Sequence, residues 1–222
     1  MSDTLAQIRS RVSFKVGGKS GIDSILNENI NEAILQVIQE ARPQEMWADS
    51  TFTTSSATAN YQFASMSTAK TDILWVLFVR NTTDDYPLYH RSYEVWNRYK
   101  QDTSSTSNLG DPHLWTRWKN GIIVFGRIPD SESRTLHYDY LKRPTRLSAD
   151  SDTFPLNDEW KRPVEELAAA LTFQDLNAID KARSKFEEYN ALMIRRMTPE
   201  GEEDASPDGS AFIPTSNLNL SS

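Results

Sequence analysis

Apolar residues recur at helical spacing in four stretches, two near each end of the chain. In each stretch they fall every three or four residues, which places them along one face of an α-helix. The longest stripe runs from Ile22 to Ala41 and stops before Pro43, a residue that cannot continue a helix. The other stripes are Leu5, Ile8 and Val12; Val164, Leu167, Ala168 and Leu171; and Ile179, Ala182, Phe186, Tyr189, Met193 and Met197. We therefore expect helices at both ends of the chain.

Between residues 47 and 157 the period of the apolar positions changes to two, which is typical of β-strands. The run Ile73–Val79 is apolar on both faces, so it is predicted to be a central strand covered on both sides. Asn120-Gly121 and Pro129-Asp130 are turn signals that separate the last three strands. The expected strands cover residues 51–53, 61–63, 73–79, 113–119, 122–127 and 134–141.

This order of elements predicts an α+β fold. The apolar stripes of the first and last helices can be buried only against each other, so the N- and C-terminal segments are expected to build one helical bundle. An antiparallel β-rich domain is then inserted into that bundle. The predicted boundaries are 1–46 and 158–197 for the two parts of the helical domain, 47–157 for the inserted β-rich domain and 198–222 for an extended C-terminal tail.

The composition after Met197 shifts to Glu, Asp, Ser, Pro and Gly, and such a segment buries too little apolar surface to fold alone. Two interpretations stay open: a free, disordered end, or a segment that becomes ordered on a partner. In the second interpretation, the late apolar residues of the tail would contact the partner. These residues are Phe212, Ile213, Leu218 and Leu220.

Charge and composition narrow the class of protein. A net charge of −7 argues against a protein that grips nucleic acid, because phosphate binding needs clustered Lys and Arg. With no cysteine, the chain has no disulfides, thiolate metal sites or cysteine nucleophiles. Residues 1–11 carry charges where a signal peptide has an apolar core. No run approaches the roughly 18 apolar residues of a membrane span, so we expect cytosolic synthesis and no membrane partner.

The chain offers little for catalysis or metal binding. Its three histidines, at positions 90, 113 and 137, lack the spacing of a metal site, and no G-x-S-x-G elbow is present. Neighbouring carboxylates such as Asp158 and Glu159 fall at predicted turns and helix starts, where capping alone favours them. We therefore predict no enzyme activity, no metal and no cofactor. A glycoside hydrolase that uses a close carboxylate pair is the remaining enzymatic alternative.

A series of short motifs resembles a known protein family. In chain order these are Gly110-Asp111-Pro112, an apolar strand closed by Pro129-Asp130, a Leu/Tyr strand ending at Pro144, then Phe154-Pro155-Leu156 and Asp158-Glu159-Trp160 before an Ala-rich helix. Together with the helical start, this order resembles the head-to-tail adaptor proteins of tailed bacteriophages, also called connector or tail-tubular proteins. The resemblance covers most of the chain and consists of pattern and order.

The resemblance implies a structural virion protein, made in the host cytoplasm, that forms a dodecameric ring beneath the portal and joins the head to the tail. The helical domain would face the portal and the β-rich insertion would face the tail. Residues 198–222 would grip the portal through the four apolar residues of the tail. The implied partners are the portal protein, a tail tube, nozzle or tail-completion protein, further copies of the chain, and double-stranded DNA in passage.

Charged helix faces are candidate contacts in such a ring. The polar face of the Ile22–Ala41 helix is either an ordinary solvated face or the lining of the lumen, where it would repel DNA phosphates. Its lumen candidates are Glu28, Glu32 and Glu40. Outward charges of the later helices, among them Glu165 and Glu166, are candidates for contacts between subunits.

Trp115 and Trp118 are candidates for a tail-side contact. They fall on opposite faces of one predicted strand, so one of them is expected to be exposed. The same aromatics, together with Tyr93, support an alternative function, a receptor- or glycan-binding tail module. Assembly separates the two hypotheses, because an adaptor forms rings on a portal whereas a glycan module trimerises alone and binds sugar.

Overall fold

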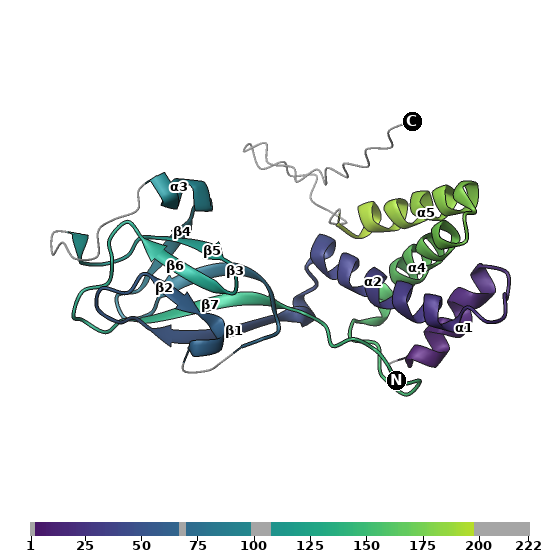
Figure 1. The fold of residues 1–222 in the computed structure, drawn as a ribbon, viewed down its shortest axis with the longest axis horizontal. Coiled ribbons are helices and arrows are strands. Elements are labelled where there is room, and N and C mark those ends of the chain that lie inside the picture. Colours follow the sequence, from purple (N-terminus) through teal and green to yellow (C-terminus); the bar gives the residue numbers. More distant parts are fainter. Residues whose placement is uncertain (1–2, 67–69, 99–107, 198–222) are drawn as a thin grey trace. The chain divides into compact units, whose positions relative to one another are not determined.

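The computed structural model describes residues 3–66, 70–98 and 108–197. The chain divides into two compact units, Met1–Glu45 with Thr145–Ser222, and Met46–Pro144 (Figure 1). The first unit is built from helices and the second from a sheet, so the predicted α+β class is confirmed. The four apolar residues predicted in the tail lie outside the described residues.

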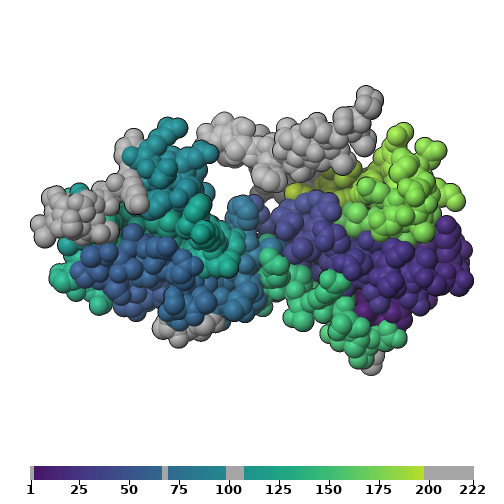
Figure 2. Space-filling model, viewed as in Figure 1, coloured from purple at the N-terminus to yellow at the C-terminus, as the bar shows by residue number. Residues whose placement is uncertain are grey.

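The helical unit contains α1 (Leu5–Lys15), α2 (Asp23–Ala41), α4 (Lys161–Asp175) and α5 (Ile179–Met197). Most residues of the predicted apolar stripes are buried, although Ile179 at the start of α5 is 54% exposed. α4 contacts each of the other three helices. Residues 168–170 of α4 are fully buried alanines, whose small side chains let the neighbouring helices approach closely. Residues far apart in the sequence, coloured purple and yellow-green in Figure 2, therefore lie side by side in this unit, as Glu40 and Tyr189 do.

The segment Thr145–Asn157 packs with the helices. The backbone N–H of Leu5 donates to the carbonyl of Asp152 at 2.8 Å. The Asn31 amide accepts from the N–H of Leu147 at 2.7 Å and donates to its carbonyl at 3.0 Å. The unit boundary therefore falls before this segment, whereas the sequence pattern predicted it after. In the sequence this segment is a polar stretch with prolines. The contacts of its backbone with α1 and α2 appear only in the structure.

The β-rich unit contains a curled seven-stranded sheet in the order β1-β7-β3-β4-β5-β6-β2. Its strands are β1 (Trp47–Thr53), β2 (Asn60–Gln62), β3 (Ile73–Asn81), β4 (Tyr86–His90), β5 (Leu114–Trp118), β6 (Gly121–Phe125) and β7 (Thr135–Lys142). Short 3-10 helices are η1 (Gln44–Met46), η2 (Phe63–Ser65) and η4 (Asp158–Trp160). The prediction of a wholly antiparallel sheet is wrong for β4 and β5, which run parallel. The connection between β4 and β5 is long and includes α3 (Tyr93–Arg98). Parallel neighbours need such a long connection, because the chain has to return to the end of the sheet at which the first strand began.

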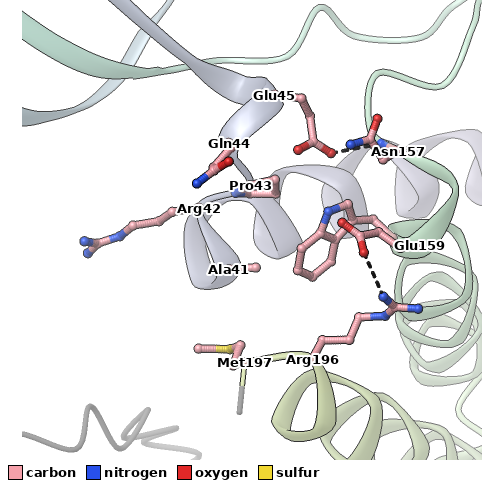
Figure 3. A pocket seen from close by; sticks show the side chains of 10 residues that line it. Ala41, Arg42, Pro43, Gln44, Glu45, Asn157, Glu159, Arg196 and Met197 are labelled. Carbon is pink, nitrogen blue, oxygen red and sulfur yellow. Dashed lines mark hydrogen bonds and ion pairs between the residues drawn. The ribbon is translucent and has the colours of Figure 1, made fainter. Parts of the chain in front are cut away.

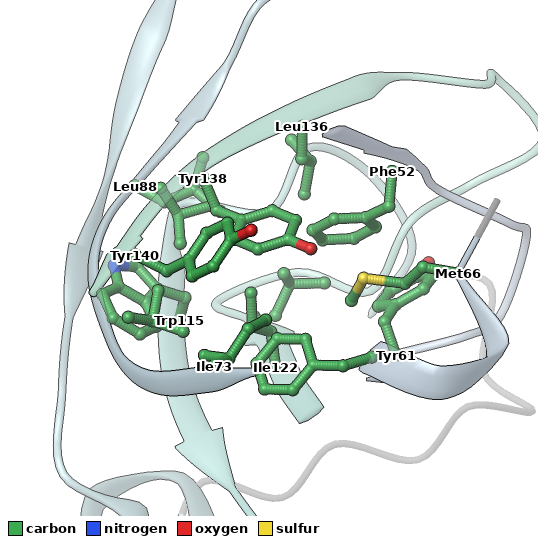
Figure 4. Close-up of a cluster of buried hydrophobic side chains, with 14 residues drawn as sticks. Phe52, Tyr61, Met66, Ile73, Leu88, Trp115, Ile122, Leu136, Tyr138 and Tyr140 are labelled. Carbon is green, nitrogen blue, oxygen red and sulfur yellow. The ribbon is translucent and has the colours of Figure 1, made fainter. Parts of the chain in front are cut away.

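Fourteen buried side chains, many of them aromatic, fill the inside of the curl (Figure 4). The rings of Phe52 on β1 and Tyr61 on β2 lie 4.8 Å apart, so the two edge strands of the sheet meet across this core. Gly121 permits the approach of β2, since a Cβ there would lie 2.5 Å from the carbonyl oxygen of Tyr61. Gly121 was predicted as a turn residue, but it pairs with Trp118 as the first residue of β6.

The prediction that β3 is covered on both faces is wrong. Val76 and Val79 point into the core, whereas Trp75 and Phe78 are exposed on the opposite face. The register against β7 shifts between Ile73 and Trp75 and again between Val76 and Phe78. Each shift inserts one extra residue, and such β-bulges redirect the side chains that follow. Two bulges therefore place both aromatic rings on the outer face.

Candidate functional site

Several histidines and carboxylates in the described residues are engaged in packing and ion pairs. No group of three or more His, Asp or Glu side chains in this part of the chain is arranged to hold a metal ion. His90 packs against the Trp115 ring at 4.7 Å, and burial together with the charge of Arg91 lowers the pKa of His90. His137 lies 3.3 Å from a carboxylate oxygen of Asp49. The features that remain to be considered are a pocket and several surfaces.

A pocket of about 740 Å³ opens in the helical unit where the described chain ends (Figure 3). It lies between the end of α2, η1, η4 and the last turn of α5. It is lined by Ala41, Arg42, Pro43, Gln44, Glu45, Asn157, Glu159, Trp160, Arg196 and Met197. Residues 198–222 continue directly from Met197. The C-terminal tail therefore leaves the helical unit at the wall of this pocket.

Polar contacts fix the pocket walls. Glu45 accepts a hydrogen bond from the backbone N–H of Asn157 at 3.0 Å, and Arg196 donates to Glu159 at 3.1 Å. The Arg196 guanidinium also lies 5.9 Å from the centroid of the Trp160 ring. The buried indole N–H of Trp160 has no acceptor among the described residues. Since buried donors are nearly always paired, the pocket wall retains one unused donor beside the exit of the tail.

The lumen candidates on α2 differ in their surroundings. Glu28 accepts from Arg146 at 2.7 Å, and Glu40 accepts from the Tyr189 hydroxyl at 2.5 Å. Burial and the bond to Glu40 raise the pKa of Tyr189, so its phenol stays protonated and donates. Glu32 is exposed and makes no hydrogen bond or ion pair with another described residue. Of the three predicted positions, Glu32 is therefore the one that presents an unengaged carboxylate.

The two glutamates expected on the outside of α4 are buried within the helical unit. Arg11 donates to Glu165 at 2.5 Å, and Lys185 lies 3.0 Å from Glu166. Lys15 contacts both carboxylates. Burial raises the pKa of Glu166, but hydrogen bonds and charges of the two lysines outweigh it, so the pKa lies below its ordinary value. These residues fasten α4 to α1 and α5, and the prediction that they point outward is wrong.

The aromatic candidates for the tail side separate in the structure. Trp115 is buried in the sheet core, while Trp118 is partly exposed. The Trp118 ring stacks on Tyr93 with centroids 3.8 Å apart and an interplanar angle of 11°. This stack occupies one face of each ring that a sugar would otherwise cover. The arrangement gives no support to the glycan-binding alternative, and Trp118 stays the candidate for a tail-side contact.

Arg134 joins three loops at one end of the sheet, and sequence reasoning missed it. Its buried guanidinium forms ion pairs with Asp84 at 3.3 Å, with Asp130 at 2.7 Å, with Glu132 at 3.1 Å and with Asp111. The hydrogen bond from Arg134 lowers the pKa of Asp130. The spacing of Asp130 and Arg134 was a local signal for this pair, whereas Asp84 and Asp111 are brought in only by the fold.

The Gly110-Asp111-Pro112 motif has a structural explanation in the same region. Gly110 has a φ of +148°, and a Cβ there would lie 2.8 Å from the side chain of Arg127. Asp111 supplies one of the carboxylates around Arg134. The carbonyl of Pro112 accepts a hydrogen bond from the Tyr86 hydroxyl at 3.1 Å. The motif therefore locks the segment before β5 onto the rest of the sheet.

Comparison with known proteins identifies the family. None of the helices in the described part of the chain has the length and apolar character that crossing a membrane requires. No curated protein matches the sequence significantly. The model of a family described as SU10 adaptor protein matches residues 3–211, a range that includes both units of the fold. This match confirms the resemblance to phage adaptor proteins, and the chain belongs to the SU10 adaptor protein family.

Proposed function

We propose that the protein is a structural component of a phage virion, a head-to-tail adaptor that forms a ring below the portal and connects the capsid to the tail. The observation that carries this proposal is the family match over residues 3–211. Within it, the helices from both chain ends act as a bundle that carries the sheet as an insertion. The proposal assigns no catalytic reaction and no cofactor to the chain.

The C-terminal tail is the proposed grip on the portal. It continues from Met197, which lines the pocket together with Trp160 and its unused donor. Phe212 lies 15 residues beyond Met197, and an extended segment of that length reaches up to about 50 Å. This reach is sufficient for the apolar residues of the tail to contact a separate protein. Those residues are Phe212, Ile213, Leu218 and Leu220.

The centre of the proposed ring is the path of the genome. With α2 facing the lumen, Glu32 would present a carboxylate to passing DNA, with Glu28 one turn before it and Glu40 two turns after it on the same helix. Like charge keeps the phosphates from binding, so the duplex slides. The net charge of −7 agrees with a channel that does not hold DNA. The proposed ring has twelve copies of the chain. Trp118 is the proposed contact on the tail side.

The test is assembly with the portal protein of the same virus, measured by size and native mass. Three proteins are compared: the full chain, a chain truncated after Met197, and a full-length chain with the four apolar tail residues changed to serine. We expect a ring-sized complex from the full chain and loss of it in the two variants. A complex that survives truncation would move the contact to the helices, and no complex from the full chain would contradict the adaptor function.

A further inference from the structure

The sheet of the β-rich unit ends in two edge strands of different length. These are β1 and β2, the first and last strands in the order of the sheet (Figure 1). β2 has three residues, whereas β1 has seven and pairs with β7 in one unbroken register. An edge strand presents a row of unpaired N–H and C=O groups to which another chain can add. β1 is therefore the place in this unit where a further strand fits.

The hydrogen bonds at the end of β1 show which of its residues face outward. The N–H of Thr54 donates to the carbonyl of Arg134 at 2.8 Å, so this pair is bonded. The carbonyl of Thr135, the ladder partner of Thr53, instead accepts from the N–H of Thr82 at 2.9 Å and points toward β3. Bonded and non-bonded pairs alternate along an antiparallel ladder. The residues of β1 that direct their N–H and C=O groups away from β7 therefore include Asp49, Thr51 and Thr53.

These outward backbone groups have no partner in the described part of the chain. Asp49, Thr51 and Thr53 are exposed, and their backbones make no hydrogen bond with another described residue. Natural sheets usually protect a long edge with lysine, proline or a bulge. β1 has none of these, and Asp49 is its only charged residue. The edge is thus open at three alternate residues, which are about 6.6 Å apart in an extended strand.

The side chains beside this edge are acidic. Asp49 pairs with Asp139 of β7, and His137 lies 3.3 Å from Asp49 and 3.7 Å from Asp139. Arg80, which pairs with His137 on the other side of β7, forms an ion pair with Asp85. A strand added to β1 would place one side chain directly beside Asp49 on the same face of the sheet. Opposite charges stabilise such cross-strand pairs, so the edge favours a strand with a cation at that position.

The edge strands of a second copy are unsuitable partners for β1. Pairing of β1 with another β1 is twofold and ends at a dimer, whereas a ring needs head-to-tail contacts. β2 is short, and its Tyr61 ring lies 4.8 Å from the Phe52 ring of β1 in the same copy. The two edges of one copy therefore lie together and do not face two different neighbours. In the proposed ring, the added strand comes from another protein.

We propose that the outer edge of β1 binds an extended segment of the tail-side protein by β-strand addition. The segment pairs its backbone with Asp49, Thr51 and Thr53 and places a cationic side chain beside Asp49. In contacts of this kind main-chain hydrogen bonds supply the affinity, and side chains at alternate positions supply the specificity. The inference rests on the proposed function, in which the β-rich unit faces the tail, and it adds a backbone contact to the contact through Trp118.

Proline at position 51 tests the backbone contact in the full chain. Because the N–H of Thr51 faces away from β7, Thr51→Pro removes an outward donor and keeps the ladder to β7. Thr51→Val changes the side chain and keeps the N–H. Binding of the purified tail-tube, nozzle or tail-completion protein of the same virus to portal-bound rings is measured. We expect about a tenfold or greater loss of affinity for Thr51→Pro and native affinity for Thr51→Val; equal affinities of the two variants would overturn strand addition.

Charge reversal tests the predicted cation. Asp49→Lys should lower the affinity for the same tail-side protein about threefold or more at low salt, and the loss should shrink at high salt. The matched control is Glu94→Lys, which reverses an exposed carboxylate on α3 and should leave the affinity unchanged. An equal effect of the two changes would contradict a cation beside Asp49. Near-UV circular dichroism verifies that each variant keeps its fold.

Hydrogen exchange at single amides provides a readout that needs no variant. In portal-bound rings alone, the amides of Asp49, Thr51 and Thr53 should exchange fast, and those of Ser50 and Phe52, which face β7, should exchange slowly. The tail-side protein should slow the first three about tenfold or more. Amides that stay fast in the full complex, or that are already slow in the ring alone, would overturn the proposal. Slowed amides in a chain that binds the tail-side protein but not the portal would support strand addition while contradicting the adaptor function.

Discussion

Replacing Glu166 with glutamine removes one negative charge from a buried site between three helices. The side chain is 4% exposed and contacts Lys15 and Lys185. Breaking a buried ion pair by removing one partner costs about 3–5 kcal/mol. Here each lysine side chain is 21% exposed and keeps a second carboxylate, Glu165 at 3.6 Å for Lys15 and Glu188 at 2.8 Å for Lys185. We therefore expect a smaller loss of unfolding free energy at pH 7, about 2 kcal/mol.

This loss should depend on pH. Burial raises the pKa of Glu166, but the two lysines outweigh burial and hold the pKa below its ordinary value. A carboxyl with a lowered folded-state pKa contributes stability above its unfolded pKa, near 4.3, and loses it as the pH falls through the folded value. The difference in unfolding free energy between the native chain and Glu166→Gln should be full at pH 7 and shrink below about pH 4.

The assay is urea unfolding followed by far-UV circular dichroism at neutral and acidic pH. The matched control is Glu188→Gln, which removes an exposed carboxylate from the same lysine. Exposed ion pairs contribute little, so the control should lose less than about 1 kcal/mol. Equal losses in the two variants, or a Glu166→Gln difference of the same size at both pH values, would refute the role of burial.

Three further predictions concern the sheet and the lumen. Arg134→Met should destabilise the β-rich unit by about 3 kcal/mol and raise hydrogen exchange in the loop of Asp111; unchanged exchange there would contradict the role of Arg134 in joining the three loops. Gly121→Ala should lower the free energy of unfolding in urea by about 1–3 kcal/mol, because its Cβ would clash with the Tyr61 carbonyl. Native-like stability would show that β2 can shift away from β6 without a loss of stability. Glu32→Lys should leave ring assembly unchanged and make the ring retain duplex DNA at low salt; absent retention would place α2 outside the lumen.

Local patterns predicted the elements better than the contacts between them. The apolar stripes identified α1, α2, α4 and α5, because helical spacing is set within a few residues of sequence. The same logic failed on β3, where an apolar run was interpreted as a strand covered on both sides. Which residue of that run is extra depends on the pairing with β7, so the bulges at Leu74 and Leu77 have no local signature.

The wrong prediction for the two glutamates of α4 has a similar cause. Glu165 and Glu166 fall away from the apolar stripe of their own helix, which favoured a solvated position. In the fold α4 contacts three helices, so its flanks are buried as well, and cations from α1 and α5 reach them. A sequence shows the stripe of one helix, but the number of its neighbours is a property of the assembled unit.

The insertion of the sheet between the two pairs of helices determines the order in which the protein can fold during synthesis. The apolar stripe of α2 is complete at Ala41, yet its partner α4 begins only at Lys161. At roughly 5–20 residues per second, the ribosome needs about 6–24 s to make the intervening stretch of roughly 120 residues. The β-rich unit is synthesised in full during this interval, while the apolar face of α2 has no α4 to pack against. The helical unit therefore closes last, and nascent chains that stall before α4 are the ones most exposed to aggregation.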